Sequence, residues 1–90
     1  MSNYWGLNVE QVKQLSTELI QAASDVDAIK SKLTGKLDSV EWNGPDATAF
    51  RSDWSGQHVT ALQTVITALN EAGAKAQANA LAQEATSNAS

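Results

Sequence analysis

The stretch Trp42-Asn43-Gly44-Pro45 stands near the middle of the chain, between two long segments with helical patterning. A glycine that follows a helix adopts the left-handed conformation that ends it. Proline suits the first position of the next helix, where its missing N–H costs nothing. The stretch therefore predicts a reversal of chain direction. We expect a helix over about 8–41, a turn at 42–44, a second helix over about 45–82 and a flexible tail over 83–90, all in one domain spanning 1–90.

The segment before this turn has both a start signal and a helical repeat. Asn8 is a good N-cap, Gln11 completes a pattern like a capping box, and Leu7 and Val12 have the spacing of a hydrophobic staple. Apolar residues then recur in alternating steps of three and four, which is coiled-coil spacing. They are Val12, Leu15, Leu19, Ala22, Val26, Ile29 and Leu33, after which Lys36 interrupts the pattern and Val40 resumes it. Gly35 is the weak point of this helix, where a kink is expected if one forms.

The segment after the turn has a less regular apolar face. It comprises Ala47, Phe50, Trp54, Ala61, Leu62, Val65, Leu69, Ala72 and Ala76. The rhythm falters at Ser55-Gly56-Gln57, so Gly56 is a candidate bend. Small side chains dominate from Ala72 onward and bury little area, which predicts a less stable end. We expect Phe50 and Trp54, four residues apart, to be core residues.

The apolar positions of the two segments are too broad for a single contact between two helices. The set predicted to pack within the hairpin or against a partner is Leu15, Leu19, Val26, Ile29, Leu33, Phe50, Trp54, Leu62, Val65 and Leu69. A hairpin of this size alone would leave part of that set in water, and small single cores are marginal. We therefore expect an all-α antiparallel hairpin that pairs with itself or a similar chain into a four-helix bundle.

Composition excludes several classes of function. The net charge of −4 argues against nucleic acid and against stable insertion into, or anchoring on, an anionic membrane. No window approaches the ~20 consecutive apolar residues of a membrane span. The first residues lack a basic region followed by an apolar run, so no cleavable secretory signal is expected.

No arrangement of reactive side chains indicates catalysis. The chain has no Cys and one His, His58, which predicts no metal site. Asp25 and Asp27 are two residues apart and do not share a helix face. Asp38 and Glu41 are close enough to be neighbours but are expected to be solvated. We therefore expect a non-enzyme with no cofactor.

The residues Trp42-Asn43-Gly44, followed by Pro45-Asp46-Ala47, Phe50 and Trp54, resemble the Trp-X-Gly (WXG) family of type VII (ESX) secretion substrates, the early-secreted-antigen-like proteins. Chain length and the central position of the motif agree, and the resemblance covers nearly the whole chain. It implies a helical hairpin that pairs into a four-helix bundle and is exported folded. Its partners would be itself or a related hairpin, together with the motor ATPase of the export machinery.

The resemblance also assigns Trp42, Asn43 and Gly44 to a composite export signal, and leaves open whether Trp42 is a surface patch or simply a core aromatic at the bend. The family's other signal element, a C-terminal Tyr-x-x-x-Asp/Glu motif, is missing: the one Tyr is Tyr4 and the tail has only Glu84 as an acid. Either a partner would then supply it, or the tail carries a variant of it. The implied location is secreted, by a route without a cleavable signal, after synthesis in the cytoplasm. Alternatives are an escort for another substrate and, more weakly, a membrane-active effector.

Overall fold

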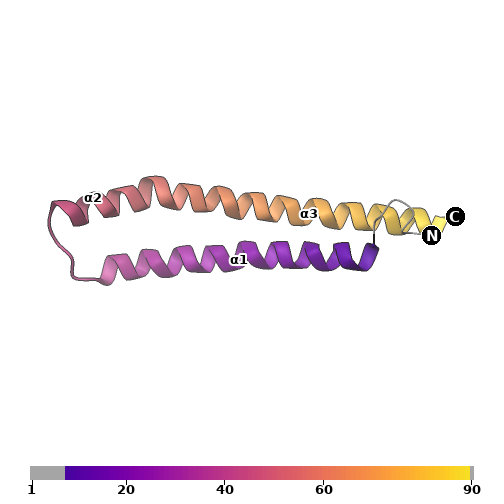
Figure 1. Ribbon diagram of the computed structural model, residues 1–90, viewed down its shortest axis with the longest axis horizontal. Coiled ribbons are helices and arrows are strands. Elements are labelled where there is room, and N and C mark those ends of the chain that lie inside the picture. The colour runs from indigo at the N-terminus through magenta and orange to yellow at the C-terminus, as the bar shows by residue number, and fades with distance from the viewer. Residues whose placement is uncertain (1–7, 90) are drawn as a thin grey trace.

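The computed structural model describes residues 8–89 and has the shape of a long rod, 67 × 17 × 16 Å. Helix α1 (Val9–Ser39) runs one way along it, and α2 (Pro45–Asp53), the π-helical turn η2 (Trp54–His58) and α3 (Val59–Ala89) return as one nearly continuous rod (Figure 1). The predicted all-α helix–turn–helix hairpin is confirmed. Pairing of two hairpins into a four-helix bundle stays a prediction.

Helix α1 begins where its capping signal predicts. The Asn8 Oδ1 atom accepts a hydrogen bond of 3.0 Å from the backbone N–H of Gln11, which satisfies one of the free donors of the first turn. The staple involving Leu7 lies outside the described residues. The helix continues through Gly35 and ends at Ser39, two residues before the expected boundary, with the Val40 N–H bonded to the Lys36 carbonyl.

The bend is built differently from the prediction. Gly44 has a φ of 113°, a conformation that side chains disfavour, but it is the N-cap of α2 rather than the residue that ends α1. Helix α1 has already ended five residues earlier, at Ser39, so residues 40–44 form a non-helical connection. Pro45 occupies the first turn of α2, as predicted, and the Gly44 carbonyl accepts the N–H of Thr48.

The irregular rhythm near Gly56 corresponds to the π-helical turn. A π turn accommodates one extra residue in an otherwise α-helical rod. On its N-terminal side the positions facing α1 include Ala47 and Trp54, and on its C-terminal side they resume at Val59 and Leu62. The step from Trp54 to Val59 is five residues, one more than an α-helical turn provides, and the π turn absorbs the difference. Gly56 therefore lies in a π turn that keeps the residues on both sides of it facing α1, within one continuous rod.

Small residues set the distance between α1 and α3. The buried positions of the described chain are Ser16, Ala23, Ala47, Ile66, Gly73 and Ala80, of which only Ile66 is large. The Ser16 hydroxyl donates a 2.7 Å hydrogen bond to the Gly73 carbonyl. A Cβ atom at Gly73 would lie 2.6 Å from the Ile20 Cγ1 atom and 3.1 Å from the Ser16 carbonyl oxygen. Gly73 is thus required by close helix approach.

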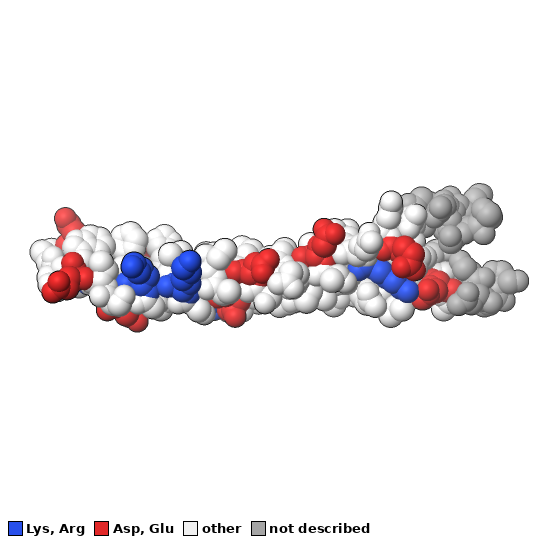
Figure 2. Space-filling view, turned by 90° about the horizontal axis from the view of Figure 1, so that it is seen from below, with Lys and Arg blue, Asp and Glu red and all other residues white. Residues whose placement is uncertain are grey.

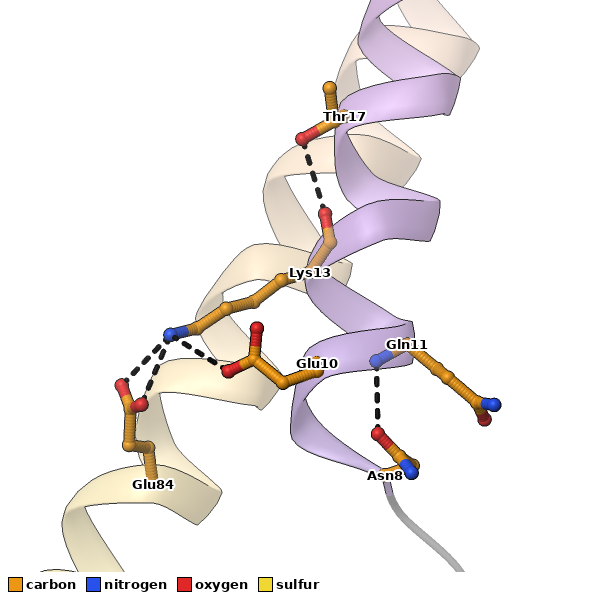
Figure 3. A network of polar contacts seen from close by, with 6 residues as sticks. All are labelled: Asn8, Glu10, Gln11, Lys13, Thr17 and Glu84. Carbon is orange, nitrogen blue, oxygen red and sulfur yellow. Dashed lines mark hydrogen bonds and ion pairs between the residues drawn. The ribbon is translucent and has the colours of Figure 1, made fainter.

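The C-terminal segment is helical where a flexible tail was expected from residue 83. Helix α3 continues to Ala89. The Lys13 ammonium bonds both carboxylate oxygens of Glu84, at 3.1 and 3.0 Å, and lies 4.0 Å from Glu10 (Figure 3). The polar composition of this segment is what predicted a flexible tail. Alanine has the highest helix propensity, and the contact to α1 anchors the last turns.

Candidate protein interaction surface

The predicted packing residues divide into two groups. Leu19, Val26, Trp54, Leu62 and Leu69 are half-buried, whereas Leu15, Ile29, Leu33, Phe50 and Val65 are exposed. Leu15 and Ile29 keep 50% and 52% of their surface in contact with solvent. The inner group packs the hairpin together, and no second layer of the described residues covers the outer group.

The total exposed area agrees with this division. The chain exposes 6441 Å², against roughly 5,000 Å² for a compact monomer of this mass. A single pair of helices forms one contact seam and leaves its outward faces open. This excess, together with the exposed large side chains, is what an uncovered interaction surface produces.

Most of the exposed large apolar residues of α1 lie on one side of the helix, and Ile20, which lies beside Gly73, is the exception. At 3.6 residues per turn, Leu15, Ile29 and Leu33 fall within an arc of roughly 40°, and Val40 lies in the same arc. Leu19 and Val26 lie between this arc and the seam that contacts α3, which explains why they are half-buried. We call the exposed or half-buried residues on this side of α1 the outer stripe: Leu15, Leu19, Ala22, Val26, Ile29, Leu33, Lys36 and Val40.

The outer stripe meets an apolar groove of about 250 Å³ at the bend. Leu33, Lys36, Leu37 and Val40 of α1 and its cap line one wall, and Phe50 and Trp54 line the other. Phe50 is exposed, so its expected place in the core is wrong: within residues 8–89, no third element covers that side of α2. The groove extends the outer stripe across to the second rod of the hairpin.

Trp42 occupies the non-helical connection and stacks on this groove. Its ring lies against Phe50 in a tilted arrangement with centroids 5.5 Å apart, a geometry that aromatic pairs favour. Trp42 is 38% exposed. It is therefore neither a buried core residue nor a fully solvated one, and it presents part of an indole face beside Asn43 and Gly44, which are also exposed.

Arg51 fixes the connection, and sequence reasoning missed it. Its guanidinium donates to the carbonyls of Trp42 at 2.7 Å, Val40 at 3.2 Å and Leu37 at 3.2 Å. Leu37 lies in the last turn of α1, whose final carbonyls have no partner within the helix. The positive charge also complements the negative end of the helix dipole. A cation three residues before Trp54, on the face that meets α1, was the available signal.

Trp54 joins η2 to α1, and His58 lies beside it. The Trp54 Nε1 atom donates to the Thr34 hydroxyl at 2.9 Å, and this contact joins η2 to α1. The His58 ring lies 6.0 Å from Trp54. In the part of the chain that the structure describes, no three His, Asp or Glu side chains are grouped to hold a metal ion.

Charges are spread along the rod rather than gathered into one basic patch. The face in Figure 2 carries acidic side chains along most of its length, with basic side chains at fewer places. Among the described residues, no helix is both long and apolar enough to cross a lipid bilayer.

Comparison with known proteins identifies no relative for this chain. No protein-family model, no curated protein and no solved structure matches it.

Proposed function

We propose that this protein is a non-catalytic interaction module of the WXG type, a hairpin that pairs with a second hairpin into a four-helix bundle and leaves the cell by a type VII route. The single observation that carries the proposal is the outer stripe. Exposed leucine, isoleucine and valine side chains at coiled-coil spacing favour burial against another helix. The Trp42-Asn43-Gly44 motif at the bend of the hairpin is the feature on which we base the proposed secretion route.

The bend is proposed to be the part of the export signal that this chain contributes. Trp42 is held against Phe50 on one side, and Arg51 holds its carbonyl on the other. An ordered, half-exposed aromatic residue is suited to recognition because little conformational entropy is lost on binding. The motor ATPase of the export machinery, alone or together with a partner's tail, is the proposed reader of this surface.

An escort role is the second candidate, and the C-terminal sequence favours it. The segment from Ala80 to Ser90 contains no Tyr, so it lacks the family's Tyr-x-x-x-Asp/Glu pattern. In this version a different hairpin supplies that motif, and the present chain leaves the cell only when its client is made. Secretion measured with and without candidate clients distinguishes the escort from a substrate exported as its own pair.

Trp42→Ala tests the signal role, with Leu81→Ala as the control because Leu81 is an exposed apolar residue far from the bend. We expect Trp42→Ala to abolish most secretion while its circular dichroism and pairing stay close to those of the parent. Leu81→Ala should be secreted normally. A folded, paired Trp42→Ala variant that is secreted at the parental level would show that the bend is not part of the signal.

A further inference from the structure

The outer stripe is interrupted by one charged residue, and that residue indicates what covers the stripe. Two sets of positions, each spaced by seven, make up the stripe. The first set is Leu15, Ala22, Ile29 and Lys36, and the second is Leu19, Val26, Leu33 and Val40. Lys36 lines the apolar groove at the bend, yet it has no ion-pair partner within the described residues. A lysine at one such position commonly specifies register in paired helices.

The steps of three and four residues between positions of the stripe follow the same order from the N-terminal end of α1 as from its C-terminal end. If two copies of α1 lie antiparallel and centred between Asp27 and Ala28, every position of the first set meets one of the second. Leu15 then lies opposite Val40 of the second copy, Ala22 opposite Leu33, Ile29 opposite Val26 and Lys36 opposite Leu19. Twofold symmetry makes each contact occur twice. A shift of seven residues in one direction leaves Leu15 and Leu19 without a partner. A shift in the other direction leaves Val40 without one and places Lys36 opposite the apolar Val12 instead of beside Glu18.

The same register provides a counter-charge for the interrupting lysine. Glu18 precedes Leu19, so it lies at the edge of the interface beside Lys36 of the second copy. Glu18 is exposed and, like Lys36, has no ion pair in the described part of the chain. The apolar part of the lysine side chain can cover the stripe while its ammonium reaches the edge.

We propose that the outer stripe is covered by a second copy of this chain, packed antiparallel along α1 in the register that pairs Lys36 with Glu18 of the second copy. This inference rests on the pairing claim of the proposed function and takes the antiparallel direction that the resemblance to the WXG family implies. It adds the identity of the partner and the register. In this arrangement the bend of one copy lies beside the open end of the other, and two Lys36–Glu18 pairs flank the apolar layers.

Charge reversal tests the register. Glu18→Lys and Lys36→Glu each place like charges at both edge sites, so each variant alone should raise the dissociation constant of the pair about tenfold. A mixture of the two variants brings opposite charges together at both sites. Native mass spectrometry should then show mixed pairs in clear excess over the statistical half. Lys75→Glu and Glu71→Lys, the same charge changes on exposed positions of α3 away from the stripe, should leave the constant unchanged.

Cysteine cross-linking tests the direction, since the natural chain has no Cys. Chains carrying Leu15→Cys mixed with chains carrying Val40→Cys should form an interchain disulfide on mild oxidation, and neither variant alone should do so at comparable yield. Both positions are exposed in the hairpin, so folding should be preserved, as circular dichroism will show.

These experiments distinguish a failure of the proposed register from a failure of pairing itself. If Ile29→Asp disperses the pair but the charge variants and the cysteines behave as their controls do, the hairpins pair in another register and this inference fails alone. If the parental chain is a stable monomer, both fail. Preferential mixed pairing with the Leu15–Val40 cross-link supports the proposed register.

Discussion

Arg51 is the residue on which the geometry of the bend most depends. Three carbonyls from three positions in chain order, Leu37, Val40 and Trp42, converge on one guanidinium. Hydrogen bonds to a charged group are stronger than those between neutral groups, and Arg51 is half-buried, so solvent competes only in part. The connection is not helical, but it is anchored from α2.

We expect Arg51→Met to free the Trp42 segment and to lower the unfolding free energy by about 1–2 kcal/mol, because the carbonyls lose their donor. In a background with Trp5→Phe and Trp54→Phe, acrylamide quenching reports on Trp42 alone and should increase. Lys30→Met is the control: it removes a cation that joins the helices through Gln63, far from Trp42. Equal quenching of Trp42 in both variants would contradict the anchoring role.

Residue-level features were predictable when their causes are local. Asn8 as a cap and Pro45 as a helix start depend on neighbours within a few positions, and both were predicted correctly. The Ser16–Gly73 contact joins residues 57 positions apart. Neither residue type signals such a contact, because close helix approach is decided by the register of the whole hairpin. The same holds for Phe50, which is exposed because no third element within the described residues covers it.

At the scale of elements, the π-helical turn reconciles two stretches of seam that one α-helix would misalign. The apolar rhythm before Trp54 and the rhythm after Val59 differ by one residue. The sequence indicated an irregularity at Gly56 but not its form, because a bend, a break and a π turn all relieve the same mismatch.

Deletion of Gly56 should therefore be tolerated. Removing one residue converts the π turn into ordinary α-helix and keeps both stretches of seam facing α1, so the melting temperature should stay within a few degrees of the parental value. Deletion of Ala68, in regular helix, rotates all later seam residues by about 100° and should abolish cooperative unfolding. Thermal unfolding followed by circular dichroism at fixed protein concentration compares them. If the Gly56 deletion is as damaging as the Ala68 deletion, the register account is wrong.

The end of α3 shows why element boundaries were less predictable than element type. Residues 83–86 are Gln, Glu, Ala and Thr, a composition shared by frayed tails and by exposed helices. The deciding contact is that of Lys13 with Glu84, which links residues 71 positions apart. Such a contact is visible only once the two helices are aligned.

At the scale of the whole molecule, the main feature is that the hairpin has more apolar surface than the single seam between its helices can bury. The described part of the chain buries one large apolar side chain, Ile66, while several others remain exposed on the outer stripe and around the groove. A stable 90-residue fold needs more buried area than one seam of small residues provides. The breadth of the apolar pattern predicted this mismatch from the sequence, although the split between inner and outer residues required the helices in place.

Sedimentation equilibrium of the purified chain measures whether a second hairpin covers the outer stripe. We predict a mass twice the 9.5 kDa of one chain at micromolar concentration. Ile29→Asp should reduce it to one chain, because a carboxylate would be buried without a partner. Ala28→Asp, an exposed neighbour on another side of α1, should leave it doubled. A stable single-chain mass for the parent at high micromolar concentration, with Ile29→Asp equally stable, would contradict the claim.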